Sequence, residues 1–342
     1  MAEARAEEPR AWPVAWQAVE GDSDGVFSRL ATLAVRAVLG GAMRLPEGVL
    51  AALLSGLARL AALVERRRVR AAHEFLRQAL GELAPAELAR RTRAAYVQLF
   101  RVTLDTERFF AQVPLTRVLE HVELVVSPEA RAVFASGRGC LVVGAHLGNW
   151  EVGLTALVAS GLHPVYGVAK PPRNRSLSRA LQRSRERHGV RILSRKGAMA
   201  AAPAVLRAGG VIGMILDQRT SGRALLAPFF GRLARCERAP GVLLKRQRVP
   251  IVMARCLMAE QPLHYRLEVG AVLDPAEWGA RAVEEIVARL NQEFERTIRA
   301  NPEQYVWIHD RYRDTPRTLE AGAAPRVARG PAAHAPEEAD EA

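Results

Sequence analysis

The spacing of apolar residues along this chain changes near Gly139. Upstream, they recur every three or four positions, the period of an α-helix, and predict helices at 66–80, 85–110 and 128–136. Downstream, apolar runs of strand length alternate with helical segments. The predicted strands are 140–145, 164–169, 191–193, 211–216, 225–230, 250–258 and 265–272. The predicted helices among them are 150–160, 175–188, 198–207, 239–246 and 281–300. This alternation predicts an α/β fold, a single mixed-sheet domain flanked by helices on both faces.

The segment 26–64 predicts an N-terminal apolar helical pair, with the second helix starting after Pro46. Five charged residues interrupt the pair, and no charge-free run approaches the ~18 residues of a spanning helix. We therefore expect both helices to lie in a membrane interface, with their arginines reaching toward lipid headgroups. A basic cluster directly afterwards, at 66–70, supports this interpretation because an anionic surface attracts it. The alternative is a helical hairpin that faces the protein core.

The two ends of the chain differ from its basic middle. Residues 1–25 hold two Arg against six acids, and residues 318–342 hold two Arg against five acids. Neither end shows sustained periodicity, so both predict disordered tails around a domain at 26–317. Because the formal charge of the whole chain is +13, the middle is more basic still.

A body this basic favours polyanionic partners, namely nucleic acid, an anionic bilayer surface, phosphorylated lipid or an acidic carrier protein. The alternative is a well-solvated, arginine-rich surface, since only three of the 49 cations are Lys. Nucleic acid has the least support, because no known binding module occurs and the cations are not interleaved with aromatic residues.

Three cysteines, Cys140, Cys236 and Cys256, lie in apolar or strand-like segments without C-x-x-C spacing. We expect neither a metal site nor a disulfide framework, and we expect a reducing compartment. The first residues include Glu3, Glu7 and Glu8, which carry the wrong charge for a signal peptide.

The candidate chemistry lies at 139–157, where an apolar strand ends in a turn and a helix follows. The turn holds His146, and Glu151 lies five positions later in the first turn of the helix. The spacing alone is uninformative, because His309 and Asp314 share it. The preceding strand favours His146, as does Asn149, a plausible N-cap for the helix.

A neutral imidazole accepts a proton from an alcohol, and a carboxylate on its other nitrogen fixes the tautomer. The alcohol must come from the substrate, because the chain has no serine elbow, no Walker loop, no G-x-G-x-x-G and no H-E-x-x-H. The alternative for His146 is a structural histidine in a turn.

Several separate pieces of the chain, in order, bear a family resemblance. Gly144 to Glu151, GAHLGNWE, resembles the H-x-x-x-x-[DE] signature of lipid acyltransferases. The other pieces are the basic cluster with His73 and Leu76; Tyr166 to Lys170 with Asn174, Leu177, Arg185 and Gly189; Gly209-Gly210-Val211 through Asp217-Gln218; Pro228 to Gly231; and Pro302 to Tyr305 through Trp307, His309, Arg311 and Pro316. Together they resemble the late acyltransferases of bacterial lipid A synthesis, the lauroyl and myristoyl transferases, from about Leu45 to Pro316.

The resemblance implies a glycerolipid-acyltransferase-like fold, and transfer of a fatty acyl group from an acyl carrier protein or coenzyme A thioester to a glycolipid hydroxyl. It implies His146 as the general base and Glu151 as its partner. The substrate-binding candidates are Asn149, Lys170, Arg185, Asp217 and Arg219. No metal and no cofactor beyond the acyl co-substrate are expected.

The expected setting is the cytoplasmic face of a bacterial inner membrane. The expected partners are acyl carrier protein, a membrane glycolipid and the anionic membrane surface. We expect His309 and Arg311 to tie the C-terminal segment to the sheet.

The chain departs from the family at 235–238, where relatives carry a Thr-rich run, and this leaves the acceptor open among envelope glycolipids. The sequence is also compatible with two other functions. One is a non-catalytic lipid-binding protein of the membrane surface, which the intact His146, Glu151, Arg185 and Asp217 argue against. The other is a hydrolase that uses water as the acceptor.

Overall fold

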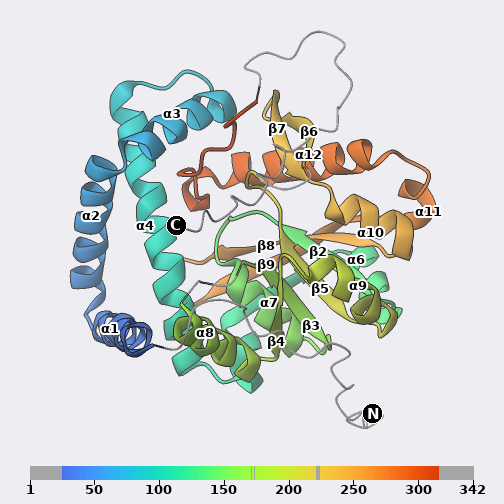
Figure 1. Cartoon of the computed structure of the whole chain (residues 1–342), viewed down its shortest axis with the longest axis horizontal. Coiled ribbons are helices and arrows are strands. Elements are labelled where there is room, and N and C mark those ends of the chain that lie inside the picture. Colours follow the sequence, from blue (N-terminus) through green and yellow to red (C-terminus); the bar gives the residue numbers. More distant parts are fainter. Residues whose placement is uncertain (1–24, 171, 173, 221–223, 316–342) are drawn as a thin grey trace, which may run out of the picture.

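Seven strands form one twisted sheet at the centre of the molecule (Figure 1). The computed structural model describes residues 25–315 except 171, 173 and 221–223. The strand order is β1-β9-β8-β2-β5-β3-β4, and every neighbouring pair is parallel except β8 with β9. The strands are β1 (Val122–Val126), β2 (Cys140–Gly144), β3 (Val165–Ala169), β4 (Val190–Ser194), β5 (Val211–Ile215), β8 (Ile251–Met258) and β9 (Tyr265–Leu273). The predicted α/β fold with a mixed sheet is confirmed.

The central strands β2 and β5 are apolar throughout because helices cover both of their faces. Every residue of β2 is buried, with Leu141 and Val143 in one core cluster and Val142 in the other. On the Val142 side lie α5 (Val118–His121), α6 (Pro128–Ala135) and α7 (Trp150–Ala159). On the other side lie α9 (Ala198–Arg207), α10 (Ala239–Gln247) and α12 (Val283–Ala300). The two cores together hold the sheet between two helical layers.

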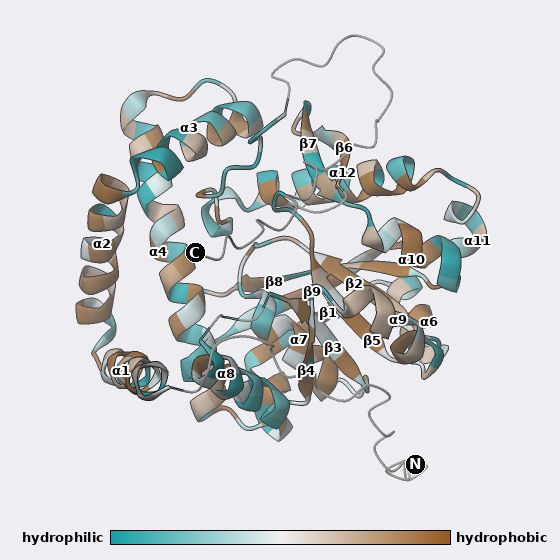
Figure 2. Ribbon diagram, viewed as in Figure 1, coloured by the Kyte–Doolittle hydropathy of each residue, from teal (hydrophilic) through white to brown (hydrophobic). Residues whose placement is uncertain are grey.

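The N-terminal helices form a separate wall beside this layered core (Figure 1). They are α1 (Val26–Ala42), α2 (Glu47–Val64), α3 (Arg66–Leu80) and α4 (Pro85–Gln112). One side of α2 packs on α4 through Leu50, Leu54 and Leu104. Only three residues of α2 are buried, although the helix is almost entirely hydrophobic in Figure 2. By length and composition alone, α2 could cross a membrane.

Helix α8 (Arg175–Arg187) joins the wall to the sheet, since it contacts both α1 and β4. Its N-cap is Asn174, whose Oδ1 accepts from the backbone N–H of Leu177 at 2.9 Å. The hydroxyl of Thr32 on α1 donates to the same oxygen at 3.2 Å. The first helix therefore contacts the start of α8 directly.

A hairpin of β6 (Ala224–Phe229) and β7 (Arg232–Glu237) stands apart from the main sheet. The predicted strand at 225–230 thus exists, but it belongs to a second sheet. Strand β7 was not predicted, because its two arginines look like surface residues. Both are buried: Arg232 pairs with Glu74, and Arg235 donates to the carbonyl of Thr220 at 3.4 Å.

Strand β1 was also not predicted, and neither were the shorter elements η1 (Leu115–Arg117), α11 (Pro275–Trp278) and η2 (Pro302–Gln304). The three helical turns are only three or four residues long, too short for a periodic pattern to register. The predicted tails at 1–25 and 318–342 lie outside the described residues, apart from Gly25.

Candidate active site

Four neighbouring strands end at one edge of the sheet, and a polar side chain follows each of them. His146 comes after β2, Asp217 after β5, Lys170 after β3 and Arg195 after β4. Because β2, β5, β3 and β4 are mutually parallel neighbours, these four residues gather at the same edge. Ligands of open α/β sheets bind at this carboxyl edge.

The imidazole of His146 is held by Asp217. Its Nδ1 lies 2.7 Å from Oδ1 of Asp217, and the same oxygen accepts the backbone N–H of His146 at 3.0 Å. Since the carboxylate only accepts, Nδ1 carries the proton and Nε2 has its lone pair free for another partner. The carboxylate on the imidazole is thus Asp217 and not Glu151, the partner that the family resemblance implied.

Asp217 is completely buried, and Tyr305 supplies its third hydrogen bond. The phenolic O–H donates to Oδ2 at 2.8 Å. Burial alone would raise the pKa of Asp217, but the adjacent His146 and the hydrogen bonds from His146 and Tyr305 hold that pKa below its usual value. Asp217 is therefore a carboxylate at neutral pH.

The backbone around His146 is clamped by the segment that contains Tyr305. The N–H of Val306 donates to the carbonyl of His146 at 3.2 Å, and the N–H of Gly148 donates to the carbonyl of Gln304 at 3.0 Å. Gly148 has a φ of +63°, and a Cβ there would lie 1.9 Å from the carbonyl oxygen of Cys256. Only glycine fits at this position of the turn that holds His146.

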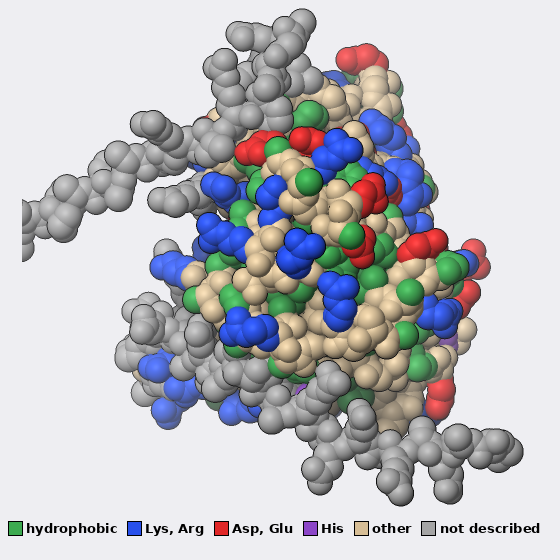
Figure 3. Space-filling view, turned by 90° about the vertical axis from the view of Figure 1, so that its right-hand side faces the viewer, with side chains coloured by type: hydrophobic (Ala, Val, Ile, Leu, Met, Phe, Trp, Pro, Cys, Tyr) green, Lys and Arg blue, Asp and Glu red, His purple; other side chains and the backbone are tan. Residues whose placement is uncertain are grey.

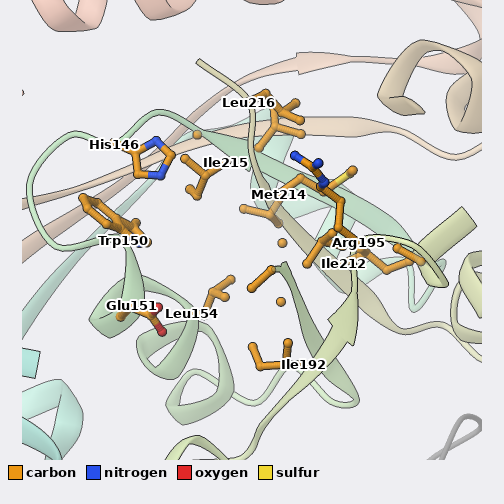
Figure 4. Close-up of a pocket in the computed structure, with 18 of the residues that line it drawn as sticks. His146, Trp150, Glu151, Leu154, Ile192, Arg195, Ile212, Met214, Ile215 and Leu216 are labelled. Atoms are coloured by element: carbon orange, nitrogen blue, oxygen red, sulfur yellow. The ribbon is translucent and has the colours of Figure 1, made fainter. Parts of the chain in front are cut away.

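His146 borders a cavity of about 530 Å³, which is within the usual range for small-ligand sites. Figure 4 shows His146 and Trp150 at one end of the pocket and Ile192 at the other, with Leu154 between them. The Trp150 ring stands edge-on to the imidazole, with 4.7 Å between ring centroids. The imidazole of His146 therefore borders the pocket and is only 21% exposed.

Leu154 lies over two strand glycines in the inner part of this pocket. A Cβ at Gly213 would lie 2.4 Å from Leu154 Cδ2, and a Cβ at Gly167 would lie 3.1 Å from Leu154 Cδ1. The two glycines thus make room for the leucine between α7 and the sheet. Most of the lining beyond His146 is apolar, with Leu157, Ile192, Ile212 and Met214 among its residues. This part of the pocket suits a hydrocarbon chain.

Glu151 forms a two-pronged ion pair with Arg185 of α8. Nε and Nη2 of the guanidinium donate to the two carboxylate oxygens, both at 2.8 Å. Burial opposes the charge on Arg185, but Glu151 raises the pKa of the guanidinium above its ordinary value. Both side chains line the pocket and keep partial exposure, so the pair forms part of its wall.

The other sequence-derived candidates occupy different positions. Lys170 and Arg219 line the pocket, and Arg219 lies 3.5 Å from Asp314. Asn149 is fully buried and is not part of the lining. Its Oδ1 accepts from the N–H of Val152 at 3.2 Å and from Thr106 at 3.1 Å, so it caps α7 as predicted.

The C-terminal residues His309 and Arg311 are structural in their contacts. Arg311 is buried over Phe229, and it donates to the carbonyl of Arg235 at 2.8 Å. His309 is buried against Phe75, and burial lowers its pKa to about 4, so it is neutral. Arg311 thus ties the C-terminal segment to the β6–β7 hairpin.

Three residues of this site were missed in the sequence: Trp150, Arg195 and Tyr305. Trp150 lies inside the motif, and its place in the first turn of α7 was the available signal. Arg195 comes two residues after the predicted strand 191–193, much as Asp217 follows the predicted strand 211–216. Tyr305 lies in one of the segments that carry the family resemblance, but no local pattern linked it to Asp217, because only the folded chain brings the two residues together.

Within residues 25–315, apart from the five undescribed positions, no group of three or more His, Cys, Asp or Glu side chains could hold a metal ion.

The fold and the site define an α/β protein with a carboxylate-held histidine at the mouth of an apolar pocket. Comparison with known proteins specifies this class further. The sequence matches the family described as bacterial lipid A biosynthesis acyltransferase over residues 26–314. It is 26% identical over 286 residues to the lipid A biosynthesis lauroyltransferase of Escherichia coli (strain K12), covering 80% of this chain and 88% of that protein. The chain belongs to this family, and it is an acyltransferase.

Proposed function

We propose that this acyltransferase moves a fatty acyl group from a thioester to a hydroxyl of a lipid A-type glycolipid, with His146 as the general base. The observation that carries the proposal is the His146–Asp217 pair at the mouth of the apolar pocket. An acyl chain in the pocket would present its thioester carbonyl near Nε2 of His146.

The reaction needs no covalent bond to the enzyme. Nε2 of His146 takes the proton of the substrate hydroxyl while that oxygen attacks the thioester carbonyl carbon. The tetrahedral intermediate then breaks its carbon–sulfur bond, and the leaving thiolate receives the proton from His146. Asp217 stabilises the imidazolium that exists between these two transfers, as the acid of a catalytic triad does.

Arg185 is the candidate for stabilising negative charge on the thioester oxygen, because its guanidinium lines the pocket. Glu151 contributes through this arginine, since it holds both of the nitrogens that face it. Lys170 and Arg219 are candidates for binding phosphate on the acceptor. Asn149 remains a predicted substrate-binding residue, although the contacts of its side chain are those of a helix cap.

The acyl donor is a thioester of acyl carrier protein or coenzyme A, and no further cofactor is required. The membrane setting rests on α1 and α2, which expose a row of large apolar side chains: Leu30, Leu33, Val38, Val49, Leu53, Leu57, Leu60, Leu63 and Val64. Such a surface buries itself in a bilayer interface. We place the enzyme at the cytoplasmic face of a bacterial inner membrane, where both substrates meet.

The test compares membranes that contain wild-type protein, His146→Ala, or His264→Ala as a control histidine outside the pocket. Each receives an acyl thioester and a lipid A precursor, and mass spectrometry follows the acceptor lipid. We expect one added acyl chain with the wild type and the control, and a loss of ~10²-fold or more with His146→Ala. A His146→Ala variant with full activity would refute the proposed base. Thioester consumption without acylated lipid would indicate a hydrolase.

A further inference from the structure

Two surface segments on one side of the molecule carry only positive charge. Residues 195–210 include α9 and residues 238–250 include α10, and together they hold seven Lys and Arg and no Asp or Glu. These cations are Arg195, Lys196, Arg207, Arg238, Lys245, Arg246 and Arg248. We call this surface the α9–α10 face.

The α9–α10 face is continuous in space because the two helices pack against each other. Figure 3 looks onto this side of the molecule and shows cations across its middle, with acidic side chains mainly toward its upper and right-hand margins. Carboxylates of the neighbouring elements α11 and α12, such as Glu277 and Glu284, belong to separate segments. Lys196, Arg207, Arg246 and Arg248 are exposed.

Three of the exposed cations on this face have no carboxylate partner among the described residues. Within the described part of the chain, no carboxylate lies within ion-pair distance of Lys196, Arg207 or Arg246. Elsewhere on the molecule, many surface arginines do have such partners, for example Arg117 with Glu120 and Arg90 with Glu87. Unneutralised like charges on one face repel one another, so an external anionic partner would gain from binding there.

One end of this face borders the mouth of the catalytic pocket. The exposed residues of the pocket lining are Lys170, Arg195, Met199 and Gln218. Two of them, Arg195 and Met199, also belong to the α9–α10 face. From there the face follows α9 to Arg207, about 15 Å along a ten-residue helix. A partner bound on it could therefore present a thioester to the pocket.

The position of the face argues against a membrane as its partner. The exposed apolar side chains of α1 and α2 lie at the opposite side of the molecule from α9 and α10 (Figure 1). If α1 and α2 lie in the bilayer, the α9–α10 face is turned away from it. Its cations are distributed over two packed helices, an arrangement that suits the surface of a protein partner.

We propose that the α9–α10 face is the docking surface for an acidic protein that carries the acyl chain as a thioester. This inference rests on the proposed function, and it selects a carrier protein over coenzyme A as the donor. Complementary charge of this kind mainly accelerates and orients the encounter, and its contribution falls as salt is added.

The test uses charge reversals far from the reacting atoms. The variants are Arg207→Glu, Arg246→Glu and the double variant. The matched control is Arg93→Glu, since Arg93 is an exposed α4 arginine that also has no carboxylate within ion-pair distance in the described part of the chain. Each protein is assayed with three donors that carry the same acyl chain: the carrier-protein thioester, the coenzyme A thioester and a short pantetheine thioester.

We expect the double variant to raise KM for the carrier-protein thioester ~10-fold or more at low salt, with kcat nearly unchanged. High salt should reduce the difference in this KM between the double variant and the wild type. The Arg93→Glu control should have a KM close to that of the wild type. An unchanged KM for the carrier thioester would overturn the proposal. An equal rise in KM for all three donors would also overturn the proposal, because the substitutions would then alter the pocket and not the docking of a carrier protein.

Two further outcomes keep this inference separate from the proposed function. Release of the double variant from anionic vesicles, with normal use of the carrier, would assign the face to the membrane and overturn the docking proposal. If the wild type transfers no acyl group from any donor, the proposed function fails. Calorimetric titration with the acylated carrier protein then tests docking on the α9–α10 face without any acyl transfer. Equal affinity of the wild type and the double variant for the carrier would reject the docking proposal.

Discussion

Nδ1 of His146 lies 2.7 Å from Oδ1 of Asp217, although 71 positions separate the two residues in the chain. Adjacent parallel strands bring them together, because β2 and β5 pair in register from Cys140 with Val211 to Gly144 with Ile215. His146 follows Gly144 by two positions, and Asp217 follows Ile215 by two positions. The contact between His146 and Asp217 is thus a direct product of strand order.

Replacing Asp217 with Asn should remove the charge that stabilises the imidazolium while keeping the size of the side chain. We expect kcat to fall ~10²-fold or more, with a smaller change in KM, because Asp217 is fully buried and does not line the pocket. Single-turnover acyl transfer at saturating donor measures this. Asp310→Asn makes the same chemical change at a carboxylate that pairs with Arg67 on the surface. If both variants kept normal rates, Asp217 would have no part in catalysis.

The sequence predicted most strands and helices, because their apolar periods are local properties. It also singled out His146, Glu151, Arg185 and Asp217, but it could not pair them correctly. Glu151 is only five positions from His146, so the motif suggested that these two residues interact. On α7 the carboxylate of Glu151 instead meets Arg185 of α8. The partner of His146 depends on which strand lies beside β2, and no short motif encodes that order.

The same limit applies to the residues that support the site. Tyr305 reaches Asp217 from 88 positions away, and its segment pairs with the His146 turn through backbone hydrogen bonds. Strand β7 was missed for a different reason. Its buried arginines are compensated by Glu74 and by backbone carbonyls from distant segments, whereas the local sequence shows only charged residues.

The Glu151–Arg185 pair should behave as one unit in a double-mutant cycle. Glu151→Ala should lower the rate by on the order of 10²-fold, because Arg185 loses the carboxylate that orients it. Arg185→Ala should cost at least as much, and the double variant should cost little more than the worse single variant. The cycle is measured as kcat/KM for acyl transfer. Additive losses would show that Glu151 acts independently of Arg185.

Shortening Leu154 should shift the enzyme toward longer acyl chains. Leu154→Ala frees the space above Gly167 and Gly213, whereas Gly213→Ala places a Cβ against Leu154 and should favour shorter chains. Competition among saturated thioesters of different length, read by mass spectrometry of the product, measures the preference. Leu162→Ala, which lies outside the pocket lining, is the control. Loss of stability in Leu154→Ala should be ~2 kcal/mol, at the low end for Leu→Ala because the side chain is only half buried. If Leu154→Ala and Gly213→Ala both kept the wild-type preference for acyl-chain length, the acyl chain would lie outside this part of the pocket.

Charges introduced on the exposed side of α2 should weaken membrane binding without unfolding the protein. Leu60 and Leu63 are 58% and 71% exposed, so Leu60→Glu/Leu63→Glu removes apolar area that the folded protein itself does not bury. Burial of one leucine contributes ~1.5–3 kcal/mol, so we expect affinity for anionic vesicles to fall at least ~10-fold. Sedimentation with vesicles measures it. Leu119→Glu, on the distant helix α5, is the control for adding a charge at an exposed leucine. An equal loss of vesicle affinity in the α2 variant and in Leu119→Glu would argue against a membrane role for α2.

The buried His309 should make stability depend on pH between about 6.5 and 4. Burial lowers the pKa of this imidazole to about 4, while Asp217 opposes the shift and Arg311 and His146 add to it. The unfolded chain has a histidine pKa near ~6.5, so in this window it binds a proton that the folded protein excludes. The stabilising contribution is therefore complete above pH ~6.5 and is lost progressively as pH falls toward 4. Over the whole window the loss is ~3 kcal/mol.

Denaturant unfolding of the wild type and of His309→Gln across this range tests the argument. The variant should lose stability at pH 7, because glutamine cannot reproduce the packing of the ring against Phe75. Its stability should nevertheless change less between pH 6.5 and 4, since one titrating group is gone. Asp217 does not confound the comparison, because its folded pKa is depressed and its contribution is lost only below the carboxyl pKa of the unfolded chain, ~3.9. Parallel pH profiles for the two proteins would show that His309 has the same pKa in the folded and unfolded chains, and the conclusion that burial keeps its imidazole neutral below pH 6.5 would have to be abandoned.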